Sequence, residues 1–191
     1  RPGAAPDDPG ILFEAEDCKP LDARFWRVLR YKQSDDLPAY PSGGGVLEAA
    51  SLGVAPASGI ASKKPTAGKY RVWARFRIPN DSNVSIAPCS IVVKQKGEPF
   101  KSVSFAIPSS DLPADLRAPE DAFVWLPYGV VELAGDEPVT VTFSQERGET
   151  PEAVPASIDC VYFSADAART TPPPADLAPR QLFLRFVVEP D

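Results

Sequence analysis

The sequence contains no histidine, the side chain that most often serves as a general base, as the base of a nucleophilic triad and as a zinc ligand. It has only three cysteines, at positions 18, 89 and 160, and none of the spacings typical of zinc or redox motifs. At most one disulfide can form. These absences argue against a zinc enzyme, a thiol redox protein and a histidine-dependent hydrolase.

Long apolar runs, basic blocks and methionine are also missing. No apolar run approaches the length of a membrane span, so we expect a soluble chain. The net charge is −6 at pH 7, and without a basic block this argues against nucleic acid as a partner. The chain begins at Arg1 and carries no signal peptide. We therefore expect a processed or excised piece of an extracellular, periplasmic or cell-surface protein.

The composition is that of a globular domain rich in loops. The 191 residues are 43% hydrophobic and 24% charged, which suffices for one domain with a proper core. The 23 prolines would interrupt long helices, but loops, turns and strand ends tolerate them. This favours an all-β domain with many connections.

Period-two alternation gives the clearest secondary-structure signal. Residues 70–78 (YRVWARFRI) alternate apolar and polar or aromatic side chains, which predicts a half-buried strand. Segment 24–31 is ambiguous between helix, strand and loop, and segment 46–52 between strand and helical turn. Segment 56–68 is predicted as a loop. Other strands are predicted at 11–17, 90–96, 103–107, 123–133, 139–144 and 157–164. This many short strands without an amphipathic helix predict an antiparallel β-sandwich.

The domain boundaries follow from changes in composition. Residues 1–10 are rich in Pro, Gly and Asp and predict a flexible N-terminal segment. The sandwich is predicted over 11–166, followed by a Pro-rich linker over 167–180. Residues 181–191 include the apolar run Gln181–Val188, which is either an additional strand or the start of a next domain.

Two carboxylates stand out in the first predicted strand. Glu14 and Glu16 are two residues apart, so in a strand both point to the same face. Their like charges repel. The pair needs a bound cation, an arginine partner or exposure to water.

Five segments occur in an order that resembles a known family. They are FEAED at 13–17, SGGGVLEAAS at 42–51, AGKYRVWARF at 67–76, FVWLPYGVVELAGDEPVTVTF at 123–143 and SIDCVYFS at 157–164. Together they resemble the galactose-binding-like jelly rolls of non-catalytic carbohydrate-binding modules, in particular families 6 and 35. The resemblance covers about residues 11–166.

The resemblance implies a structural calcium ion held by carboxylates of the first strand and the aspartate of the last. Carried over to this sequence, these ligands are Glu14, Glu16 and Asp159. A hard cation prefers several oxygen ligands and would remove the repulsion between the two glutamates. The alternative is that both glutamates are solvated or pair with arginine, while Asp159 caps a turn.

Aromatic side chains are the usual platforms for sugar rings. Tyr31 and Tyr40 lie in or near a polar Pro/Gly-rich loop and are candidates. Trp73 and Arg75, on the polar face of strand 70–78 with two further arginines, could stack a sugar and pair with an acidic group on it. The alternative is a solvated face of cross-strand ion pairs. We expect Trp26, Trp125 and Tyr128 to serve packing.

Strand alternation also predicts where Cys160 points. If Glu14, Glu16 and Asp159 share one face, Cys160 lies on the opposite face and becomes a small core residue. A disulfide between Cys18 and Cys160 is then not expected.

An enzyme without histidine or a nucleophile motif would need a pair of carboxylates, as in a glycosidase. The candidates, Glu48, Glu132, Glu146 and Glu149, are scattered in the sequence. We therefore expect a non-catalytic module that binds a polysaccharide or glycan and is covalently part of a larger multidomain protein. The alternative is a structural or protein-interaction β-sandwich with no sugar site.

Overall fold

The computed structural model describes residues 10–20, 22, 24–31, 41–50, 56–61, 63–78, 85–96, 100–103, 107–108, 117–118, 123–145 and 153–173. These residues form strands and two short 3-10 turns. No helix among them has the length and apolar character needed to span a membrane.

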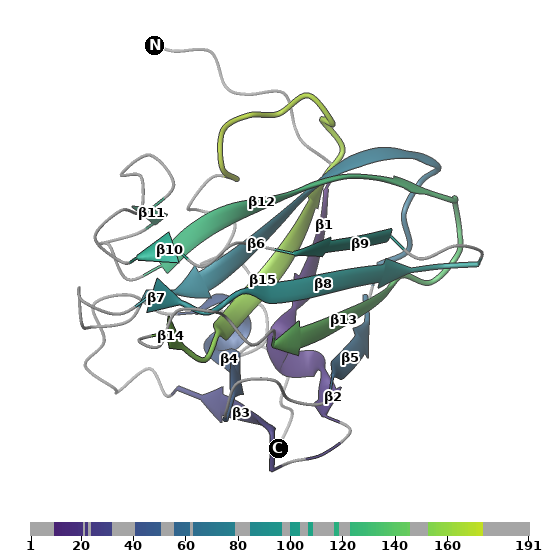
Figure 1. Cartoon of the computed structure of the whole chain (residues 1–191). Coiled ribbons are helices and arrows are strands. Elements are labelled where there is room, and N and C mark those ends of the chain that lie inside the picture. The colour runs from purple at the N-terminus through teal and green to yellow at the C-terminus, as the bar shows by residue number, and fades with distance from the viewer. Residues whose placement is uncertain are drawn as a thin grey trace, which may run out of the picture.

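The larger sheet has seven strands in the order β11-β12-β6-β15-β4-β3, with β1 also paired to β15 (Figure 1). All of its pairings are antiparallel. Its strands are β1 (Ile11–Glu14), β3 (Trp26–Arg30), β4 (Gly45–Ala49), β6 (Gly68–Arg77), β11 (Arg117–Ala118), β12 (Phe123–Leu133) and β15 (Ser157–Ser164).

The second sheet has five antiparallel strands in the order β2-β5-β13-β8-β9. These are β2 (Lys19–Pro20), β5 (Ala57–Ile60), β8 (Cys89–Lys94), β9 (Phe100–Val103) and β13 (Thr140–Gln145). A small third sheet joins β7 (Ser85–Ile86), β10 (Ile107–Pro108) and β14 (Ala153–Val154).

The main core lies between the two large sheets. Phe13 from β1 meets Phe143 from β13, with ring centroids 6.1 Å apart. The hydroxyl of Tyr128 on β12 donates to the backbone carbonyl of Cys89 on β8 over 3.0 Å. Alternating side chains of both sheets fill the space between them, as in a β-sandwich. The predicted antiparallel β-sandwich is confirmed.

The structure corrects some predicted elements. The first strand ends at Glu14 and continues as the 3-10 turn η1 (Ala15–Asp17) instead of reaching residue 17. The predicted loop 56–68 contains strand β5. Strand β9 begins three residues before the predicted strand 103–107. Interruption of the strand 123–133 is confirmed, because its pairing with β6 shifts register between Pro127 and Gly129.

Strand β6 is buried on both faces, so the prediction of a half-buried strand is wrong. Its apolar face joins the main core, while Trp73 on the other face packs in a second cluster with Trp125, Cys160 and Tyr162. Trp73 and Arg75 are each only 2% exposed. Alternation alone does not reveal this burial, because arginine and tryptophan at alternate positions are also typical of a solvated face.

Several predicted features lie outside the described residues. They are the flexible segment apart from Gly10, Tyr40, residues 174–180 of the linker, and the run Gln181–Val188.

Candidate functional site

Asp159 lies where three strands meet. The start of β15 pairs with β4 through Ser157 and Ile158, and its remainder pairs with β1 from Cys160 onward. Opposite β6, the register shifts between Ile158 and Cys160. Asp159 therefore lies at a bulge in β15, between the part of β15 that pairs with β4 and the part that pairs with β1. Such irregularities re-aim side chains.

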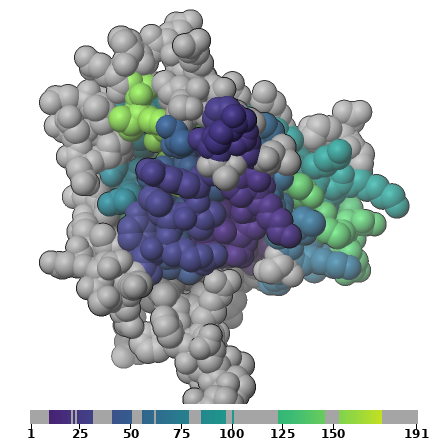
Figure 2. Space-filling view, turned by 90° about the horizontal axis from the view of Figure 1, so that it is seen from below, coloured from purple at the N-terminus to yellow at the C-terminus, as the bar shows by residue number. Residues whose placement is uncertain are grey.

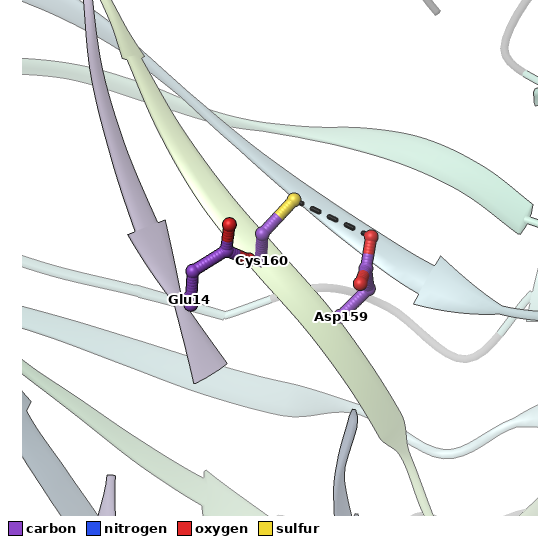
Figure 3. Close-up of side chains that lie close together, drawn as sticks. All are labelled: Glu14, Asp159 and Cys160. Atoms are coloured by element: carbon purple, nitrogen blue, oxygen red, sulfur yellow. Dashed lines mark hydrogen bonds between the residues drawn. The ribbon is translucent and has the colours of Figure 1, made fainter. Parts of the chain in front are cut away.

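This bulge brings Glu14, Asp159 and Cys160 together, as Figure 3 shows. One oxygen of each carboxylate and the Cys160 sulfur all lie within 4.8 Å of one another. The thiol donates to Oδ2 of Asp159 over 3.5 Å. Cys160 is buried as predicted, but its predicted placement on the face opposite to Asp159 is wrong, because the bulge breaks the alternation on which that prediction depended.

Glu16 reaches the same place from η1. A side chain at Gly43 would overlap Oε1 of Glu16 and would lie 3.0 Å from Cδ of Glu14, so both carboxyl groups border this glycine. Gly43 has φ +62°, a conformation that favours glycine. We call Glu14, Glu16 and Asp159 the carboxylate cluster.

The turn η2 (Ser42–Gly44) covers the carboxylate cluster. The Ser42 hydroxyl donates to Oε1 of Glu14 over 2.7 Å, and its backbone amide donates to the Asp159 carboxylate. The motif SGGG thus supplies a hydroxyl, an amide and a glycine that leaves room for two carboxyl groups. The role of Ser42 and Gly43 was not predicted, and the glycine run was the available signal.

Burial and mutual repulsion govern the charge of the cluster. Burial, followed by the nearby Glu14, raises the pKa of Glu16 to about 8. Burial raises the pKa of Asp159 to about 7, and this outweighs the lowering effect of Arg75. Both acids favour the protonated form unless a cation compensates their charge.

The cluster has the donors that a metal ion needs. Both Glu16 carboxyl oxygens and Oδ1 of Asp159 are buried, and within the described part of the chain no side chain donates a hydrogen bond to them. Buried charged oxygens of this kind are costly unless a cation or donor satisfies them. The group formed by Glu14, Asp159 and Cys160 could hold a metal, with carboxylate oxygens as hard ligands and the thiol as a soft one.

Arg75 forms one wall of the cluster. Its Nη1 donates to Oδ2 of Asp159 over 2.8 Å, and its guanidinium lies 4.1 Å from the centroid of the Phe123 ring. This ion pair is fully buried. A sugar could not stack on Trp73 or pair with Arg75 while both side chains stay covered, which counts against their predicted ligand-binding role.

Tyr31 lies beside η2, directly after β3. Its backbone amide donates to the carbonyl of Gly44 over 2.8 Å. Its hydroxyl accepts a 2.7 Å hydrogen bond from Nη1 of Arg77, whose guanidinium lies 5.6 Å from the ring centroid. The Tyr31 side chain is half-buried, so part of it reaches the surface. The molecular surface formed by the first part of the chain is seen in Figure 2.

The carboxylates considered for catalysis do not form a pair where the structure describes them. Glu48 on β4 bonds to Arg27. Glu132 lies on β12, and two strands separate it from β4. Three strand spacings amount to about 14 Å, beyond the carboxylate separation of roughly 5–9.5 Å in glycosidases. Glu146 and Glu149 lie outside the described residues.

Comparison with known proteins gives structural similarities only. No family model matches the sequence, and no curated protein matches it. A GH26-CBM35 β-(1,4)-mannanase of Podospora anserina is 16% identical with a TM-score of 0.47, over 87% of this chain and 29% of that one. A family 35 carbohydrate-binding module of Clostridium thermocellum is 18% identical with a TM-score of 0.44, over 81% and 98%.

A third similar structure is the insecticidal crystal protein Cry2Aa, at 12% identity and a TM-score of 0.49, over 84% of this chain and 22% of that one. The modules that the sequence motifs resemble are thus among the structures similar to this chain. The chain spans less than a third of the mannanase and of the crystal protein. At such low identities and TM-scores, ligand and activity have to be argued from the chain's own residues.

Proposed function

We propose that this domain is a non-catalytic carbohydrate-binding module. It binds a polysaccharide or glycan and directs a larger extracellular protein to it. We further propose that the carboxylate cluster holds one structural calcium ion through Glu14, Glu16 and Asp159. The domain itself carries out no reaction, and any catalysis belongs to other parts of the larger protein.

The convergence of Glu14, Glu16 and Asp159 on η2 is the observation that carries the proposal. Glu14 ends the first strand, Glu16 lies in the following turn η1 and Asp159 lies in the last strand, and these are the residues on which the family resemblance expects a cation. The described structure brings all three to the border of Gly43 or Ser42. Calcium prefers oxygen ligands and would take the buried oxygens of Glu16 and Asp159, with backbone carbonyls and water completing its shell.

The proposed cation supports the sugar-binding surface indirectly. It would fix η2 against β1 and β15, and η2 in turn holds the backbone of Tyr31 through Gly44. Tyr31 would present its ring to the C–H face of a sugar, with Arg77 fixing the orientation of the ring. Tyr40 remains a proposed second platform in the same loop. A preorganised aromatic platform binds without an additional ordering cost.

A second candidate function is a structural or protein-interaction domain with no sugar site. The burial of Trp73 and Arg75 favours it, because it removes two of the four predicted ligand-binding side chains from the surface. In that case the cation and the sandwich serve only as a rigid spacer.

Affinity gel electrophoresis separates the two functions. The whole chain is run through gels containing soluble β-mannan, xylan, β-glucan or polygalacturonate, with calcium and with a chelator. Retardation by at least one polymer, reduced by the chelator, is the expected result. Unchanged mobility in every gel would overturn the binding function and leave the spacer.

A further inference from the structure

A cleft of about 540 Å³ opens between the ends of β8 and β12 and the edge strand β9. Its volume is within the range of small-molecule sites. Its lining is mixed, and the apolar residues Val93, Phe100, Val130 and Leu133 share it with a larger polar surface. Two charged side chains, Lys96 and Glu132, also line it. None of these residues belongs to the carboxylate cluster or contacts Tyr31 in the hydrogen bonds described above.

A bulge in β12 directly precedes the residues of this strand that line the cleft. After Pro127 the register shifts, and Gly129 takes φ +102°, which side chains rarely adopt. A Cβ at Gly129 would lie 3.5 Å from the Phe100 ring, so β12 passes close to this ring beside the cleft. The next residue, Val130, is 38% exposed. A half-buried aromatic ring and an exposed aliphatic side chain therefore stand together at the cleft.

Some polar side chains of the cleft already form hydrogen bonds within the protein, and others can bind a ligand. The Gln95 amide is fully engaged: it donates to the carbonyls of Ala134 and Glu137 over 3.2 and 3.1 Å and accepts from the Ala134 amide over 2.8 Å. It fixes the turn after β12 as a wall. Lys96 and Glu132 are exposed, and among the described residues neither forms an ion pair, although Lys69 faces Glu132 across the sheet.

This combination favours one class of ligand. A sugar ring has an apolar C–H face for Phe100 and Val130, and hydroxyls that accept from an ammonium and donate to a carboxylate. A lipid or apolar peptide would leave both charges of Lys96 and Glu132 without a partner. A nucleic acid would meet one lysine beside a glutamate on a chain with net charge −6.

We propose that this cleft is a second carbohydrate subsite, in which Phe100 and Val130 contact the face of a neutral sugar residue while Lys96 and Glu132 bond its hydroxyls. This inference rests on the proposed carbohydrate-binding function. Two subsites on one module engage separate residues of one polysaccharide chain, or two chains, and raise the apparent affinity through effective concentration.

Surface variants test the cleft without disturbing the core. Lys96→Met and Glu132→Gln are compared with the matched controls Lys94→Met and Glu137→Gln, whose side chains do not line the cleft. The probe is the neutral polysaccharide that retards the wild-type chain most strongly in affinity gels. Each cleft variant should weaken its apparent affinity roughly tenfold to hundredfold, the effect of one lost hydrogen bond to a charged group. The controls should match the wild type, and melting temperatures should show that all five proteins are folded.

The outcomes distinguish failure of the proposed subsite from failure of the proposed carbohydrate-binding function. Wild-type retardation that weakens in both cleft variants but not in the controls supports the subsite. Wild-type retardation that stays unchanged in the cleft variants overturns the subsite and leaves the carbohydrate-binding function intact. No retardation of the wild-type chain by any neutral polysaccharide overturns the subsite. If the acidic polymers also fail, the carbohydrate-binding function is overturned with it.

Discussion

Arg75 and Asp159 form an ion pair in which the two side chains are 2% and 0% exposed. The pair joins β6 to the bulge of β15 and lies beside Glu14 and Cys160. The same bulge that aims Asp159 at the carboxylate cluster therefore also places it against a guanidinium. Any cation at the cluster shares this aspartate with Arg75.

Removing one partner of this pair should cost more than removing both. Arg75→Met leaves a carboxylate buried alone and should destabilise the domain by about 3–5 kcal/mol, because an unpaired buried charge is not compensated. The double variant Arg75→Met/Asp159→Leu should cost clearly less than the sum of the single variants. Urea unfolding in chelator at pH 8, above the pKa of about 7 that Asp159 has beside Arg75, measures all four proteins. Strict additivity would contradict the coupling.

Without a divalent cation, the stability should fall as the pH rises. Burial raises the pKa of Glu16 from 4.5 to about 8 and that of Asp159 from 3.8 to about 7. Between about pH 4 and pH 8 the folded chain thus retains protons that the unfolded chain has lost, so unfolding is favoured as the pH rises. Thermal melts in chelator from pH 4.5 to 8.5 measure this. A melting temperature that rises across this window would contradict the account of the cluster.

Calcium should reverse that trend. The ion binds the deprotonated carboxylates, so its stabilisation should be small at pH 5 and largest near pH 8. Melts with millimolar calcium and with magnesium as the comparison measure the difference. Calcium that stabilises equally at both pH values would argue that it binds elsewhere.

Gly43→Ala should weaken the response to calcium. The new methyl group would require φ +62° from an alanine, at a cost of about 1–2 kcal/mol, and it would overlap the Glu16 carboxyl. Gly68→Ala is the matched control, because its Cβ would meet nothing closer than 4.0 Å. The calcium-induced shift in melting temperature should shrink in the first variant and persist in the second. An undiminished shift in Gly43→Ala would remove η2 from the cation site.

Tyr31 should contribute to glycan binding through its ring. Tyr31→Phe keeps the ring and loses only the hydroxyl that accepts from Arg77, so its affinity should stay within about twofold to threefold of wild type. Tyr31→Ala should lose roughly fivefold or more, because an aromatic contact contributes about 0.5–1.5 kcal/mol in addition to the apolar area that the ring buries. Titration calorimetry with the polysaccharide selected in gels gives both values. Equal affinities of Tyr31→Ala and the wild type would place the platform elsewhere.

Strands with strong local signals could be predicted from the sequence. Residues 70–78, 123–133 and 157–164 are rich in β-branched and aromatic side chains and end at turn residues, and all three are strands in the structure. Glu14, Glu16 and Asp159 were predicted as one group because the resemblance to the carbohydrate-binding modules implies it. The structure places Glu14 and Asp159 together and Glu16 against the same glycine.

Features that depend on tertiary context could not be predicted. The 3-10 turn at Ala15–Asp17 and the bulge beside Asp159 change which way side chains point, and no local signal marks either. The alternation of β6 indicated one buried face, whereas Trp73, Trp125, Cys160 and Tyr162 bury the second face as well. Periodicity cannot distinguish a solvated arginine from one that is covered and paired with a distant aspartate.

Screening the intact chain on an array of immobilised glycans, with calcium present, tests carbohydrate binding most directly. A non-catalytic carbohydrate-binding module should bind a related set of glycans that share a sugar residue. The bound glycans should be recovered uncleaved. Absence of binding to every neutral and acidic glycan on the array, by a chain shown to be folded and calcium-loaded, would contradict the proposed function.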